Sequence, residues 1–201
     1  MKYSPTRIAA PALAMAFVVG CGGGGNNSHA SPKSSGVDMQ QAAGKADRLI
    51  GDTLSSVRPP LEWTHDASDS GMCTGAPELG DVTRRAVVMT QVSEGRRGSL
   101  LGIIERAWEK SGYTITKVNP DKKFPAIFAD AGDGVLRMGL TVGYKGQFFL
   151  KVQTACVDKS KVAQPSTPGK GTDYRGKEVP TPNVHSDFWS SDKPVASGSP
   201  S

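Results

Sequence analysis

Apolar residues recur at helical spacing in two stretches of the chain. The first stretch runs from Met39 to Leu54, with apolar positions three and four residues apart, and it ends before Pro59-Pro60. The second stretch follows Ser99, which is a suitable N-cap, and Gly112 closes it. Each stretch therefore predicts an amphipathic helix that turns one face toward a core.

Strand-like segments precede and follow the second helix. We predict strands at Ala86–Val92, Tyr113–Val118, Ala126–Ala129, Val135–Tyr144 and Gln147–Cys156. A tight turn at Lys145-Gly146 joins the last two, and the stretch from Leu61 to Asp81 is expected to be irregular. The order α-β-α-β-β-β-β predicts a single small α+β domain over residues 38–158. We expect an antiparallel sheet of four to five strands with two helices on one side.

The first twenty residues have the order of a secretory signal peptide. Lys2 and Arg7 form a short positive region, and Ile8–Val19 is an apolar run of twelve residues that ends next to Gly20. A bilayer span needs about 20 apolar residues, so this run is too short to be one. We therefore expect residues 1–20 to be a signal peptide that is removed.

The end of this segment, Val18-Val19-Gly20-Cys21, resembles the lipobox of bacterial lipoproteins. The resemblance implies that the Cys21 sulfur carries a diacylglyceryl group and that a signal peptidase cleaves between Gly20 and Cys21. Only a thiolate is nucleophilic enough to form the thioether at ordinary pH. The alternative is an ordinary cleavage site beside a chance cysteine. If the lipobox interpretation holds, residues 21–37 are the lipidated cysteine and a flexible linker rich in Gly, Ser and Asn.

The other end of the chain is also rich in residues that do not build a core. Pro, Gly and Ser make up 18 of the 43 residues from 159 to 201, which predicts a largely disordered tail. Phe188 and Trp189 are the exception. These adjacent aromatic residues would dock either on their own domain, which we favour, or on a partner, and they are the candidate partner contact.

Several segments of the core and tail resemble a family of small actinomycete lipoproteins to which no function is assigned. The likeness covers most of the chain and adds no activity to the interpretation. It is carried by Glu94–Arg97, Gly112–Thr116, Val118–Pro120, Phe124–Phe128, Val142–Phe148 and His185–Trp189.

The chain has three cysteines. If Cys21 carries lipid, Cys73 and Cys156 remain as an even pair in an oxidising compartment, where a disulfide is expected. A redox-active or nucleophilic thiol is the alternative, but the sequence holds no Cys-x-x-Cys motif and few histidines. We therefore predict that a structural Cys73–Cys156 bond pins the irregular stretch to the last strand.

Other candidate sites are weak. His65, Asp66 and Asp69 lie close in sequence, but zinc sites want three or four ligands at defined spacing. The segment Asp130–Gly134 lacks the alternating carboxylates of a calcium loop and is expected to be a hairpin turn. Glu105 and Glu109 lie one helical turn apart, and the basic residues between and beside them indicate a solvated face. We predict no metal and no cofactor.

The charge balance is modestly basic, with a formal net charge of +5. The pairs Arg84-Arg85, Arg96-Arg97 and Lys122-Lys123 lie near predicted element ends. Such pairs would form a patch facing anionic headgroups or wall polymers, or they would simply be a soluble surface. Nucleic-acid binding is not expected outside the cytoplasm.

No phosphate-binding loop, His-Glu-x-x-His or Gly-x-Ser-x-Gly motif is present. We expect a lipoprotein anchored through Cys21 to the outer face of the cell membrane. It would act as a binding or accessory module without catalytic activity, and its partner would be a membrane or envelope protein. The alternative is an extracytoplasmic enzyme or ligand-binding protein that acts on cell-envelope material.

Overall fold

The computed structural model describes residues 36–193, so Gly20, Cys21 and the predicted signal peptide lie outside the described residues. The described chain forms an α+β domain, which confirms the predicted class. Its elements are α1 (Met39–Ser55), β1 (Trp63–Cys73), β2 (Ala76–Val88), α2 (Glu94–Lys110), β3 (Thr114–Asn119), β4 (Ala126–Asp130), β5 (Leu136–Val142), a 3₁₀ turn (Tyr144–Gly146), β6 (Phe148–Thr154) and β7 (Val157–Asp158).

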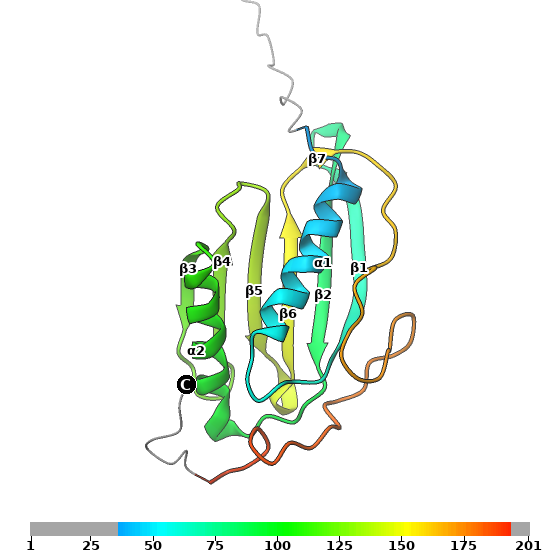
Figure 1. The fold of residues 1–201 in the computed structure, drawn as a ribbon. Coiled ribbons are helices and arrows are strands. Elements are labelled where there is room, and N and C mark those ends of the chain that lie inside the picture. Colours follow the sequence, from blue (N-terminus) through cyan, green and yellow to red (C-terminus); the bar gives the residue numbers. More distant parts are fainter. Residues whose placement is uncertain (1–35, 194–201) are drawn as a thin grey trace, which may run out of the picture. The chain divides into compact units, whose positions relative to one another are not determined.

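The strands of this region form one antiparallel sheet of seven strands, in the order β1-β2-β6-β5-β4-β3, with β7 paired to β2. Both helices lie on the same face of the sheet (Figure 1). On this face, α1 packs mainly on β2 and β6, whereas α2 packs on β3 and β4, toward the β3 end of the strand order. The core therefore lies between the helices and one face of the sheet, and the opposite face has no helical cover.

The first helix follows its prediction closely. Asp38 caps it, since its carboxylate accepts a hydrogen bond from the Gln41 backbone N–H at 2.8 Å. Its apolar face is buried against the sheet. The two helices are also joined directly, because Trp108 Nε1 donates a 2.9 Å hydrogen bond to Thr53 Oγ1. This bond satisfies the one polar atom of a large buried side chain, as a core tryptophan requires.

The prediction of an irregular stretch from Leu61 to Asp81 is wrong. These residues form β1 and the first half of β2, a long hairpin that adds one strand to the five predicted, and the short β7 makes seven. The signal is weak because β1 is an edge strand, and beyond Asp66 most of its residues are exposed, whether they are polar or apolar. A register shift between Asp66 and Asp69 breaks the alternation further. The strand predicted at Ala86–Val92 is only the end of β2.

The second helix begins earlier than predicted. It starts at Glu94, with Ser93 in the N-cap position, instead of after Ser99. Its first turns contain Gly95 and Gly98, which are poor helix formers and conceal the helix from a pattern search. Its end is as predicted, since Gly112 closes it with a left-handed φ of 81°.

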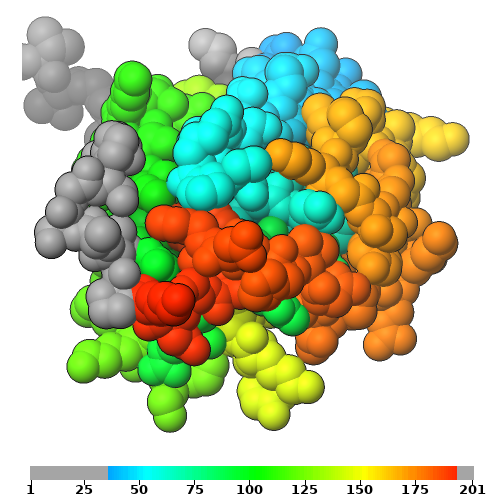
Figure 2. All heavy atoms as spheres, turned by 60° about the horizontal axis from the view of Figure 1, so that its bottom comes forward, coloured from blue at the N-terminus to red at the C-terminus, as the bar shows by residue number. Residues whose placement is uncertain are grey.

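The prediction of a largely disordered tail is wrong for residues 159–193. These residues form a continuous band across the end of the molecule (Figure 2). Trp189 is fully buried in the main core, and its Nε1 donates a 2.8 Å hydrogen bond to the Pro59 carbonyl. Phe188 packs edge-on against Trp189, and Arg96 lies 4.4 Å from its ring centre. The tail folds through a few anchors and main-chain hydrogen bonds, which leave no periodic pattern in the sequence.

These contacts decide the role of the aromatic pair. Phe188 and Trp189 dock on their own domain, the option favoured from the sequence, and Trp189 is not accessible as a partner contact. The predicted disulfide is confirmed: Cys73 and Cys156 are bonded, with their Cα atoms 6.1 Å apart. It joins the end of β1 to the segment that follows β6.

Candidate functional site

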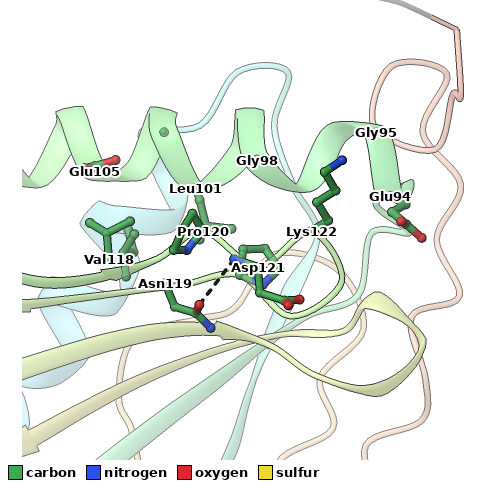
Figure 3. Close-up of a pocket in the computed structure, with 13 residues that line it drawn as sticks. Glu94, Gly95, Gly98, Leu101, Glu105, Val118, Asn119, Pro120, Asp121 and Lys122 are labelled. Carbon is green, nitrogen blue, oxygen red and sulfur yellow. Dashed lines mark hydrogen bonds between the residues drawn. The ribbon is translucent and has the colours of Figure 1, made fainter.

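A cleft of the described domain lies between α2 and the loop that joins β3 to β4 (Figure 3). Its volume is about 610 Å³. Its floor is apolar and its rim carries charged groups. The lining residues are Glu94, Gly95, Gly98, Leu101, Gly102, Glu105, Val118, Asn119, Pro120, Asp121, Lys122, Pro125 and Ile127.

The cleft exists because α2 presents glycines where other helices present side chains. A Cβ atom built at Gly95 or Gly98 would meet nothing within 4 Å, so both positions open onto free space. Each glycine costs about 1 kcal/mol of helix stability relative to alanine. Beneath them, Leu101 and Ile127 are buried, and Val118 remains 48% exposed. The missing side chains therefore leave an apolar floor open at this side of the domain.

A bulge in β3 directs a second apolar side chain into the cleft. The pairing of β3 with β4 shifts between Ile115 and Lys117. Ile115 pairs with Ala129 and Val118 pairs with Ile127, both of which are buried on the helix side of the sheet. Paired residues of antiparallel strands share a face. The bulge thus turns both Ile115 and Val118 toward α2, although they are three residues apart.

Strand β3 is also the last strand of the sheet at this side. It pairs with β4 along one edge, and within residues 36–193 no segment pairs with its other edge. An unpaired edge presents backbone N–H and C=O groups that can accept a further strand. The free edge and the cleft adjoin, because Val118 and Asn119 of β3 line the cleft. Main-chain bonding and apolar pockets are therefore available side by side.

The rim of the cleft is mainly acidic. Glu94 and Glu105 lie toward opposite ends of the cleft on α2, Asp121 lies on the loop, and Lys122 is the one cation among the lining residues (Figure 3). The pKa of Asp121 is held below its ordinary value, because its carboxylate accepts the backbone N–H groups of Phe124 and Lys123 at 2.7 and 2.8 Å. Asp121 is therefore a fixed negative charge at neutral pH.

The loop below the helix is held in place by its own hydrogen bonds. Asn119 Oδ1 accepts the Asp121 N–H at 3.3 Å, and its amide nitrogen donates to the Phe124 carbonyl at 3.1 Å. Arg97 of α2 donates to the Lys123 carbonyl at 3.1 Å, which ties the loop to the helix. The cleft is thus formed before any ligand binds.

The predicted basic patch is not formed by the arginine pairs. Neighbouring residues of a strand point to opposite faces, so Arg84 is buried with Asp47 while Arg85 lies on the open face and pairs with Asp69. Arg96 is buried beneath the tail and bonds to the Lys193 carbonyl. These side chains hold the fold together and do not share a surface.

The residues of the weak metal candidate also lie on opposite faces of a strand. His65 faces the core side of β1, where its Nε2 lies 2.9 Å from the Thr167 carbonyl, whereas Asp66 lies opposite Arg85 on the other face. Burial lowers the pKa of His65, so its ring is neutral. No group of His, Cys, Asp and Glu within residues 36–193 is arranged to hold a metal ion. The Asp130–Gly134 segment is a hairpin loop, in which Asp133 accepts the Val135 N–H at 2.8 Å.

A buried polar cluster fastens the tail to the domain. Asp47 and Arg84 form an ion pair at 3.0 Å with exposed fractions of 2% and 1%, and Arg84 also donates to the Ala163 carbonyl at 2.7 Å. Burial raises the pKa of Asp47, although Arg84 opposes the shift. His65 is buried beside them and bonds to Thr167. The cluster lines no cleft and serves to fix the tail.

The cleft was not predicted from the sequence, where Glu105 was interpreted as part of a solvated face. The sequence signal for it is the spacing of Gly95, Gly98 and Gly102 along one helix. Neither α1 nor α2 has the length and apolar character needed to cross a bilayer, and the described residues hold no other candidate.

Comparisons with protein-family models, with curated proteins and with solved structures gave no match.

Proposed function

We propose that the chain is a lipoprotein tethered through Cys21 to the outer face of the cell membrane. In this proposal the domain is a binding module without catalytic activity, and it holds an extended segment of a membrane or envelope protein. The tether is supported by the sequence alone, through the positive, apolar and small residues that precede Cys21. The likeness to small actinomycete lipoproteins agrees with this location.

The observation that carries the binding proposal is the position of the cleft beside an unpaired edge strand. An extended peptide that adds to β3 would form main-chain hydrogen bonds along the edge. Alternate side chains of such a peptide would then point toward α2, where Gly95 and Gly98 leave room for them. Affinity would come from the backbone pairing and specificity from the cleft.

The charges of the cleft indicate what the segment contains. Glu94, Glu105 and Asp121 outnumber the single cation, Lys122. A partner segment with apolar side chains and a lysine or arginine would match both the floor and the rim. An acidic segment would be repelled, so the rim contributes to the choice of partner.

A binding function is favoured over acid–base catalysis by the place of the shifted groups. Asp47 has a raised pKa, as a general acid requires, but it is buried with Arg84 beneath the tail. In the cleft, the pKa of Asp121 is lowered, which keeps the carboxylate ionised. The cleft is thus better suited to hold a cationic segment than to transfer a proton.

The tether is tested by the Cys21→Ser variant. We expect loss of labelled palmitate and accumulation of unprocessed or aberrantly cleaved protein, because serine cannot form the thioether. Labelling with palmitate in growing cells and the apparent mass of the product give the readout. Palmitate on the Cys21→Ser protein would contradict the tether.

The binding proposal is tested by photocrosslinking in cells that produce the full chain. A benzophenone amino acid at position 118 lies in the cleft, and the same residue at position 72 is a matched control, since Met72 is an exposed apolar residue on β1. We expect a discrete adduct with another protein from position 118 and none of the same mass from position 72.

A second pair of variants links the adduct to the cleft. Gly98→Leu fills the cleft, and Gly51→Leu places the same side chain on α1 at a position that also opens onto free space. The adduct should disappear with Gly98→Leu and persist with Gly51→Leu. An adduct that survives Gly98→Leu, or no adduct at all from position 118, would contradict the proposal.

A further inference from the structure

The face of the sheet that no helix covers also carries a groove. Two hollows of about 500 and 480 Å³ share Phe128, Arg137 and Met138, so together they run from β6 across β5 and β4 to β3. With strands about 4.8 Å apart, this path is about 14 Å long. A groove of this length suits a chain-like ligand.

The groove is shaped by two phenylalanines, one lying against a glycine within β5 and the other against the glycine that directly follows it. A Cβ atom at Gly139 would come within 2.9 Å of the Phe128 ring, and one at Gly143 would come within 2.8 Å of the Phe149 ring. Both rings are half-buried and fold down onto the sheet. Gly139 and Thr141 form the floor between them. The result is a shallow slot with aromatic faces on two sides.

Cations gather along this slot. Its lining includes Arg85, Arg137 and Lys151 and no carboxylate, and the adjoining hollow adds Lys117 and one acid, Asp130. Arg85 and Lys151 stand directly opposite each other on β2 and β6, an arrangement that is unfavourable without a counter-charge. Asp69 pairs with Arg85, and Asp130 stands opposite Arg137 on β4, but neither Arg137 nor Lys151 forms an ion pair with a described residue.

We propose that this groove binds an acidic sugar chain, with carboxylates of the chain on Arg137 and Lys151 and the apolar faces of its sugar rings on Phe128 and Phe149. This site is separate from the cleft between α2 and β3, and it does not depend on a peptide partner. Guanidinium and ammonium groups bind carboxylates through charge-assisted hydrogen bonds. The aromatic faces add apolar contact, which a purely electrostatic surface would lack.

A flat membrane surface fits the groove less well. The phenylalanine rings are folded onto glycines and do not project outward, so they offer no apolar wedge for a bilayer. The cations line a hollow of the sheet face. A slender chain can enter such a hollow, whereas a plane of headgroups cannot follow it.

The experiment uses the full lipidated chain held in nanodiscs of neutral phosphatidylcholine. Hexagalacturonate is titrated by calorimetry at low salt, and its methyl ester serves as a matched ligand without charge. The test variant is Arg137→Gln/Lys151→Gln, and the control is Arg106→Gln/Lys110→Gln, which removes the same charge from exposed positions of α2. A second test variant, Phe149→Leu, removes one aromatic face.

We expect hexagalacturonate to bind and its ester to bind more weakly. The groove variant should lose about tenfold or more in affinity, since two charge-assisted contacts are removed, and the α2 control should not. Phe149→Leu should weaken the acid and the ester alike. The proposal is overturned if hexagalacturonate does not bind, or if the α2 control loses as much affinity as the groove variant. It is also overturned if the nanodisc-held protein floats with phosphatidylglycerol vesicles through Arg137 and Lys151 while hexagalacturonate has no effect on it.

Discussion

The two edges of the sheet are treated differently. At the β1 edge the tail covers the start of the strand, because the Trp63 backbone exchanges hydrogen bonds of 2.8 and 2.9 Å with Lys170 of the tail. This approach requires Gly169, where a Cβ atom would come within 2.7 Å of the Trp63 carbonyl oxygen. At the β3 edge, no residue between 36 and 193 provides such cover.

Cover at the β1 edge contributes to the stability of the fold, whereas the β3 edge stays unpaired beside the cleft. Edge strands invite pairing with other chains, so proteins usually cover or blunt them. Here the cover of β1 is fastened by buried groups, Trp189 at one point and the cluster of Asp47, His65 and Arg84 at another. The β3 side instead has glycines where helix-stabilising residues would fit. We interpret the covered edge as part of folding and the open edge as a surface for binding.

The largest expected effect comes from releasing the tail. Trp189→Ala should lower the free energy of unfolding by about 3–5 kcal/mol, because it empties a fully buried site and leaves the Pro59 carbonyl without its donor. Urea denaturation followed by fluorescence measures the change. Tyr144→Ala is the control, since Tyr144 is 78% exposed and should change stability little. Equal stability of the Trp189→Ala and wild-type proteins would mean that the tail is not part of the fold.

The disulfide should have the next largest effect. Cys73→Ser and Cys156→Ser should each lower the free energy of unfolding by about 2–4 kcal/mol, since the bond joins cysteines with a sequence separation of 83. The double variant should match either single variant, because all three lack the same bond. Thermal and urea unfolding are the measurements. Two titratable thiols at these positions in unreduced protein would contradict the bond itself.

The pH dependence tests the attachment of the tail at the β1 edge. Burial lowers the pKa of His65, so below about pH 6.5 the unfolded chain takes up a proton that the folded chain resists. The free energy of unfolding contributed by His65 is therefore complete above that pH. It should fall as the pH drops below about 6.5, by up to about 1.4 kcal/mol per pH unit. The raised pKa of Asp47 has the opposite effect, because it increases the free energy of unfolding as the pH falls.

His65→Asn separates the two contributions. This variant should lose the decline below about pH 6.5 that belongs to His65 and keep the pH dependence that belongs to Asp47. Urea midpoints at several pH values, measured on both proteins, give the comparison. A decline of the same size in His65→Asn would show that another group is responsible.

The smallest effect should appear at the open edge, with the opposite sign. Gly98→Leu should raise the free energy of unfolding by about 1 kcal/mol, because leucine favours the helix and its side chain enters free space. The same protein should lose the crosslinked partner. A destabilised Gly98→Leu protein would mean that the cleft is closed in solution, and the contrast between the two edges would then fail.

Some features of this protein follow from the sequence alone. Helix α1 and the closing glycine of α2 were predicted from spacing and caps, because both depend on residues within one turn of each other. The pairing of Cys73 with Cys156 followed from counting, once Cys21 was assigned to lipid. The hairpin turns at Lys145-Gly146 and Asp133-Gly134 were likewise local, and the structure bears them out.

The remaining features were decided by tertiary structure. Strand β1 and the tail carry few apolar residues, and each is ordered only because the other elements supply backbone partners and a place for Trp189. The cleft arises because the bulge in β3 turns Val118 toward glycines that lie about 20 residues earlier in the chain. The cations of the open face meet only through strand register, which joins Arg85 to Lys151. A linear pattern records which residues are present, but such sites depend on distances across the fold.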